Sequence, residues 1–113
     1  MLFLVELDHV KSGIPLSPEA GLSFIKQYIF PTLARAEQLV AEKKIVAGGP
    51  VVGHIALRLI VEADSLAEVD RLVYSLPLYP LAETKITPLI AFADRRASVQ
   101  AVVERLSQGA DAR

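Results

Sequence analysis

The stretch that decides the fold is GHIALRLIVEADSLAEVDRLVYSLPLYP, which runs from Gly53 to Pro80. Its first ten residues alternate between aliphatic and mixed side chains, which predicts a strand over 53–62 with one aliphatic face. Ser65 with Glu68 three residues later forms a capping box and predicts a helix start. Pro77 cannot continue a helix, so the stretch indicates a strand, a helix and a stiff connector.

The remaining chain adds elements on both sides of this stretch. We expect a strand over 2–7 and a loop over 11–15. A helix should run from Ser17 to Lys44, either kinked at Pro31 or divided there into two short helices. A strand over 45–47 should leave through a turn at 48–50, a strand over 83–92 that contains Pro88 should lie at an edge or carry a bulge, and a helix over 97–108 should precede a polar tail. This order is βαββαβ with one extra helix. It predicts an α+β, ferredoxin-like fold with an antiparallel four-stranded sheet, as one domain over 1–113 in which 96–113 form the C-terminal helix and tail.

Composition and charge exclude several classes of function. The net charge of -1 gives no electrostatic basis for binding nucleic acid or an anionic membrane, and no apolar run is long enough to span a bilayer. The chain has no cysteine and only two histidines, without zinc-ligand spacing, so we expect no metal site. The start MLFLVE lacks the basic region of a secretory signal, so the expected location is the cytoplasm.

The second face of the predicted sheet should carry large apolar residues, because hydrophobic residues make up 52% of the chain. Helices cover only one face in this topology. A second copy of the chain could cover the other, so the expected partner is the protein itself, as a homodimer or larger assembly.

Candidate site residues lie on that second face. Strand alternation places His54, Ala56 and Arg58 on it, with Glu6 on a neighbouring strand that we expect to run parallel to the first. Histidine and a desolvated carboxylate can exchange protons near neutral pH, and arginine can bind a carboxylate through two hydrogen bonds. The pattern favours proton transfer on an anionic substrate. A structural Glu–Arg ion pair is the competing interpretation, and His54 alone could be a surface residue.

The run from Gly53 to Pro80 resembles the muconolactone Δ-isomerase family, and so does the opening MLFLVELD. The resemblance implies dimeric α/β barrels that assemble into larger rings, use no cofactor, and move a proton to shift a double bond in a carboxylated lactone. His54 matches the Gly-His of that family and would act in proton transfer together with Glu6. Arg58 would hold the carboxylate, and Tyr79 could reach the mouth of the pocket.

Two alternatives stay open. The segments at 47–50 and 61–65 also resemble the YCII-related domains, whose suspected histidine–aspartate dyad this chain lacks. The protein could also be a non-catalytic dimeric barrel that binds a small apolar or aromatic acid.

Overall fold

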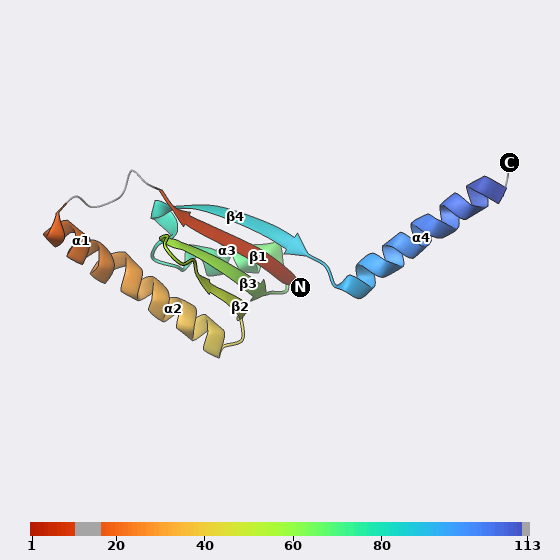
Figure 1. The fold of residues 1–113 in the computed structure, drawn as a ribbon. Coiled ribbons are helices and arrows are strands. Elements are labelled where there is room, and N and C mark those ends of the chain that lie inside the picture. Colours follow the sequence, from red (N-terminus) through yellow and green to blue (C-terminus); the bar gives the residue numbers. More distant parts are fainter. Residues whose placement is uncertain (11–16, 112–113) are drawn as a thin grey trace.

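The computed structural model describes residues 1–10 and 17–111 (Figure 1). The strands are β1 (Leu2–His9), β2 (Ile45–Pro50), β3 (Ala56–Glu62) and β4 (Ala82–Leu89). The helices are α1 (Pro18–Phe24), the π-helical turn η2 (Ile25–Ile29), α2 (Phe30–Ala41), α3 (Leu66–Tyr74), the 3₁₀ turn η3 (Tyr79–Leu81) and α4 (Phe92–Asp111). The loop predicted over 11–15 and the end of the tail lie outside the described residues.

The four strands form one sheet in the order β2-β3-β1-β4, with all neighbours antiparallel. This confirms the ferredoxin-like α+β fold and the central position of β1 and β3. The expected parallel orientation of these two strands is wrong, because the β2–β3 hairpin reverses the chain once after the helical crossover. Directly opposed residues of an antiparallel pair still share a face, so Glu6 and Arg58, which are opposite each other, lie on the same side.

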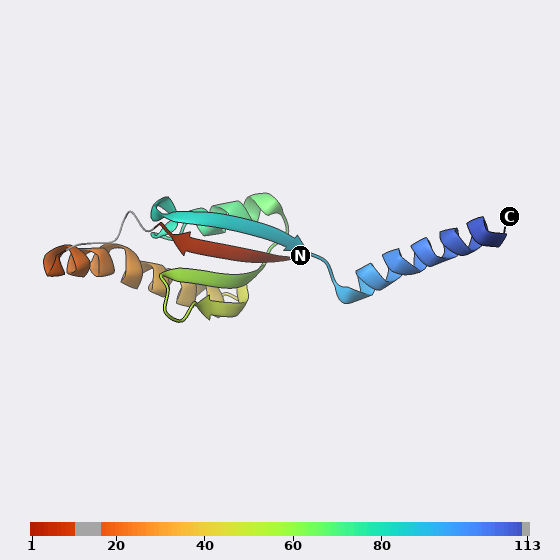
Figure 2. The same ribbon diagram turned by 45° about the horizontal axis from the view of Figure 1, so that its top comes forward.

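One face of the sheet carries the core. Alternate residues of β1 and β3 are almost fully buried, with Phe3, Val5, Leu7, Leu57, Leu59 and Val61 each at most 5% exposed. They join residues of both α2 and α3 in a single hydrophobic cluster, and Figure 2 shows the two helices behind the sheet. Within residues 1–10 and 17–111, no helix lies over the opposite face (Figures 1 and 2). Ile55 falls on the aliphatic face of the strand predicted over 53–62, but it is 41% exposed because it precedes β3.

The long N-terminal helix starts where the sequence predicts. Ser17 accepts a hydrogen bond from the backbone N–H of Ala20 at 3.1 Å and Pro18 occupies the first turn. Pro31 cannot donate a backbone hydrogen bond and its ring crowds the preceding turn. The chain accommodates it by widening to the π-helical turn just before α2, where the N–H of Phe30 bonds to the carbonyl of Ile25. The helix therefore continues past Pro31 instead of breaking into two.

The β2–β3 connection differs from the expected hairpin turn. Gly48, Gly49 and Pro50 belong to β2, and the turn lies at 51–55, closed by the N–H of Val51 donating to the carbonyl of Ala56 at 2.9 Å. Gly48 adopts a φ of 113° and sits opposite Leu59, just after a register shift between Ile45 and Ala47. A glycine pair with proline is typical of turns, but here it allows an irregular edge strand.

The segment SLPLYPL, which runs from Ser75 to Leu81, connects the end of α3 to α2. Leu76 and Leu78 are buried in the core, and Pro77 follows the end of the helix. The backbone N–H of Leu78 donates to the hydroxyl of Thr32, which is only 3% exposed, at 2.9 Å. The connector is therefore part of the core packing.

The capping box of α3 is also an ion pair. Glu68 accepts hydrogen bonds from Lys44 Nζ and from the backbone N–H of Asp64, both at 2.8 Å, while its own N–H donates to Ser65. The bond from Lys44, followed by that from Asp64, holds the pKa of Glu68 below its usual value of 4.5. The same pairing raises the pKa of Lys44 above 10.5.

Glu68→Gln is expected to lower the melting temperature in a pH-dependent way. A carboxylate with a depressed pKa stabilises the fold above its unfolded-state pKa and loses that effect as the pH falls through the folded value, whereas Lys44 loses its effect as the pH rises past its raised pKa. The difference from wild type should be constant between about pH 5 and pH 10 and shrink below about pH 4. Thermal melts across pH test this, with Glu104→Gln on α4 as control; a difference independent of pH would contradict it.

The last helix stands apart from the sheet (Figures 1 and 2). α4 begins at Phe92, five residues earlier than predicted, and every residue from Phe92 to Gly109 is exposed. In the described part of the chain, no helix is both long and apolar enough to cross a membrane.

Candidate functional site

Charged residues gather in adjacent rows on the uncovered sheet face. Lys85 of β4, Glu6 of β1 and Arg58 of β3 are directly opposed across three strands. In the next row Glu83 lies opposite Asp8, which lies opposite Ala56. Directly opposed side chains of an antiparallel sheet point to the same side. The first row thus alternates in sign and the second places two acids side by side, with the apolar residues Leu4 and Ile60 next to the first row.

Arg58 is the centre of this cluster. Its Nη2 lies 3.0 Å from Asp8 Oδ1 and its Nε lies 3.4 Å from Glu6 Oε1. Its Nη1 donates to the carbonyl oxygen of Leu57 at 2.9 Å. The side chain of Glu6 is 26% exposed and that of Asp8 is 49% exposed, so Glu6 is the better shielded acid. In this state both carboxylates hold the guanidinium against the sheet.

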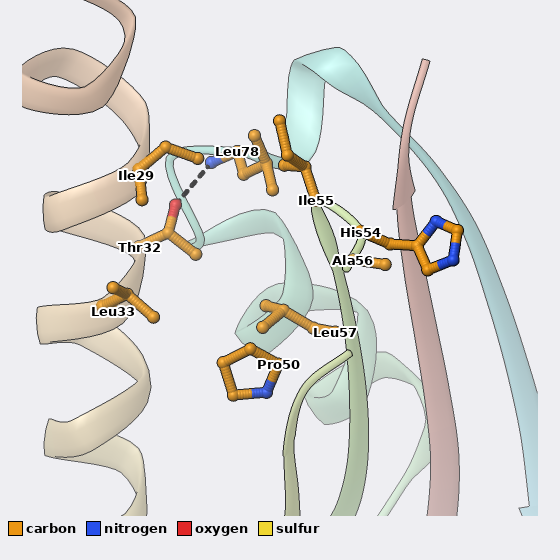
Figure 3. A pocket seen from close by; sticks show the side chains of 9 residues that line it. All are labelled: Ile29, Thr32, Leu33, Pro50, His54, Ile55, Ala56, Leu57 and Leu78. Carbon is orange, nitrogen blue, oxygen red and sulfur yellow. Dashed lines mark hydrogen bonds between the residues drawn. The ribbon is translucent and has the colours of Figure 1, made fainter. Parts of the chain in front are cut away.

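His54 lies at the end of the same face, outside the strand. It belongs to the turn at 51–55, not to β3 as expected, because Gly53 with a φ of 83° bends the chain there. Its ring projects to the same side as Ala56, away from α2 (Figure 3). His54 also borders a cavity of about 190 Å³ between α2 and the start of β3, whose other walls are mostly apolar. The structure therefore brings Glu6 and Arg58 together and leaves His54 beyond Ala56.

Tyr79 lies apart from this cluster. It begins η3, packs partly buried against the core, and its ring centroid lies 4.6 Å from that of Tyr74 on α3. It does not border the cavity next to His54, whereas its neighbour Leu78 does.

Sequence reasoning missed Asp8 as a member of the site. The alternation Glu6-x-Asp8 placed both acids on one face, and only the register shows that Arg58 bridges them. Lys85 of the edge strand β4 lies in the same row as Glu6. Among residues 1–10 and 17–111, no group of three histidine, aspartate or glutamate side chains comes close enough to hold a metal ion.

An antiparallel sheet with helices on one face and a charged cluster on the other defines a ferredoxin-like protein with a candidate small-molecule site. Within this class, the model of the muconolactone delta-isomerase family matches residues 1–95. The chain belongs to the muconolactone delta-isomerase family, which confirms the first of the two resemblances seen in the sequence. No curated protein sequence matches it significantly.

Two solved structures share the fold. A muconolactone isomerase crystal structure superposes with a TM-score of 0.64 at 20% identity, over 80% of this chain and 90% of that one. The 5-chloro-2-hydroxyhydroquinone dehydrochlorinase from Burkholderia phenoliruptrix AC1100, in complex with 2,5-dihydroxybenzoquinone, gives a TM-score of 0.58 at 27% identity. That match covers 83% of this chain and 98% of the other.

Proposed function

We propose that the protein is an isomerase that moves a proton to shift a double bond in a small carboxylated lactone derived from aromatic compounds. The observation that carries the proposal is the Glu6–Arg58–Asp8 cluster on a sheet face that no helix of the chain covers, in a member of this family. The names of the two structural relatives support it. An isomerase that shifts a double bond and a dehydrochlorinase that removes HCl must both take a proton from their substrate.

The residues divide the work as follows. Arg58 binds the substrate carboxylate, which takes the place of Asp8, the more exposed of its two acidic partners. Glu6, 3.4 Å from Arg58, takes a proton from a ring carbon, and the electron pair of that C–H bond moves into the conjugated system. Glu6 or His54 then delivers a proton to the far end of the shifted double bond, so that no atom is gained or lost.

A second copy of the chain would enclose this site. The uncovered face is open to solvent in one chain, and its apolar members Leu2, Leu4 and Ile60 lie next to the charged rows, toward the N-terminal end of β1. Two such faces packed together make a dimeric α/β barrel with the charged clusters inside. Exclusion of water strengthens the electrostatic interactions there.

A non-catalytic function is the second candidate. The apolar cavity beside His54 suits a small apolar acid, and both carboxylates already neutralise Arg58. In this case the protein binds aromatic acids without moving a proton.

Deuterium exchange into carboxylated lactones separates the two functions. In D₂O, the wild-type protein should introduce deuterium into the lactone at the carbons that lose or gain the proton, which NMR detects. The shifted double bond should also change the ultraviolet absorbance of the lactone. Arg58→Ala should raise KM at least about tenfold, because a charge-assisted hydrogen bond contributes about 1.5 to 3 kcal/mol. Arg71→Ala on α3 is the control. Ligand-induced thermal stabilisation without deuterium exchange, across a panel of lactones, would favour the binding function and overturn the isomerase.

A further inference from the structure

α4 carries an apolar stripe from Phe92 to Leu106. Phe92 is 96% exposed, Val99 52%, Val103 49% and Leu106 67%. Together with Arg96 these residues follow one another at alternating intervals of four and three positions. That is the spacing at which helices pair along a seam. Val102, 40% exposed, widens the stripe.

Nothing in the chain's own described body covers this stripe. The molecule exposes 8057 Å², whereas a compact protein of its mass exposes about 6,100 Å². Its radius of gyration is 19.9 Å, against about 13 Å for a compact chain of this length. The excess of about 2,000 Å² on one chain is more than the about 800 Å² that each partner buries in a standard protein interface, so it leaves enough surface for such a contact. A single 20-residue helix of mixed composition is also marginal by itself in water.

We propose that α4 pairs with α4 of a second copy of this chain, in antiparallel orientation. Between Val99 and Leu106 the residues of the stripe are all apolar. The same surface on a second copy can therefore pack against it. Charge fixes the orientation, because Arg96 within the stripe and Arg95 beside it both lie in the N-terminal half of the helix. Parallel pairing would set four arginines side by side, whereas antiparallel pairing places them at opposite ends of the seam.

Seam geometry gives the register. When the two stripes run in opposite directions, their spacings of four and three residues coincide if Val99 packs against Val103 of the second copy. The aliphatic stem of Arg96 then covers Leu106 of the second copy, with its charged end in water. Opposed helix dipoles add to the preference for this orientation.

This surface is separate from the sheet face that the proposed function uses. The family match ends at residue 95, so nearly all of α4 lies outside the part shared with the family. The pairing does not depend on the proposed function. If the sheet faces pair into dimers and the α4 helices also pair, the protein forms assemblies larger than a dimer, in which α4 connects one dimer to the next.

Mass measurement on the full chain tests the pairing. Val103→Glu places a charge in the seam and should raise the dissociation constant of this contact at least about 100-fold, reducing the particle mass in sedimentation equilibrium to half or less. Ala101→Glu makes the same change in charge on the back of the helix and should leave the mass unchanged. A wild-type mass of 12.3 kDa, or equal masses for wild type and Val103→Glu, would overturn the proposal.

Disulfide trapping tests the orientation, and the chain has no cysteine of its own to interfere. A Val99→Cys chain mixed with a Val103→Cys chain should form the mixed disulfide in preference to either symmetric one. Predominance of the two symmetric disulfides would show parallel pairing and overturn the antiparallel arrangement.

Discussion

Replacing Gly48 with alanine is expected to destabilise the folded protein by about 3 to 5 kcal/mol, a large fraction of the stability of a domain this size. A Cβ on Gly48 would lie 2.0 Å from the carbonyl oxygen of Arg58 and 2.9 Å from the Cα of Leu59, both backbone atoms of β3. The φ of 113° adds strain for any residue with a side chain. Relief requires β2 to move away from β3, which breaks their ladder and shifts the strand that carries Arg58.

Chemical denaturation and thermal melting measure this effect, and Gly49 supplies the matched control. Its added Cβ would meet nothing within 4 Å and its φ is not positive. Gly49→Ala should therefore change stability by less than about 1 kcal/mol. If the Gly48→Ala protein does not accumulate while Gly49→Ala does, the expected ranking still holds. Equal midpoints for the two variants would show that the irregular strand tolerates a side chain.

Glu6→Gln is expected to lower kcat of the proposed isomerisation by about 10² to 10⁴-fold, the usual contribution of a positioned acid or base. Glutamine keeps the shape of the side chain but cannot accept the substrate proton. Stability should change little, because Glu6 meets Arg58 in a partly exposed ion pair, and such pairs contribute at most about 1 kcal/mol.

Steady-state kinetics with deuterium exchange measures this loss. Glu83→Gln makes the same chemical change on the same sheet face, on the edge strand β4, and should keep kcat within about threefold of wild type, since it lies outside the contacts of Arg58. Asp8→Asn should affect KM more than kcat, because Asp8 only occupies Arg58 before the substrate arrives. Near-normal turnover in Glu6→Gln would remove Glu6 from its role as base.

Local sequence signals predicted the elements whose cause is local. The capping box at Ser65 and Glu68, the helix start at Ser17 and the alternation of β3 from Leu57 to Val61 were all found where residue chemistry placed them. The placement of Glu6 and Arg58 on one face of the sheet followed from alternation and strand order, although the expected parallel orientation of their strands was wrong. The caps and the alternation depend on residues a few positions apart in the sequence. The placement of β1 beside β3 depends on the strand order of the ferredoxin-like fold.

The missed features depend on partners distant in the sequence. Gly48 and Gly49 have the composition of a turn, and only the pairing of Gly48 with Leu59 shows that they belong to a strand. His54 lies outside the strand that was predicted to contain it, because the turn is closed by the hydrogen bond between Val51 and Ala56. The early start of α4 at Phe92 was missed because its large apolar residues are 40 to 96% exposed in the described structure, so core packing does not mark where the helix begins.

The position of β1 at the centre of the sheet determines when the protein can fold. This strand is made first, yet both of its neighbours come late, since Leu2 pairs with Glu62 on one side and with Leu89 on the other. Contacts this distant along the chain close slowly, whereas the β2–β3 hairpin can form locally. During synthesis the apolar run at 2–7 must therefore wait until residues up to Leu89 have emerged. We expect this waiting segment to make the nascent protein depend on chaperones.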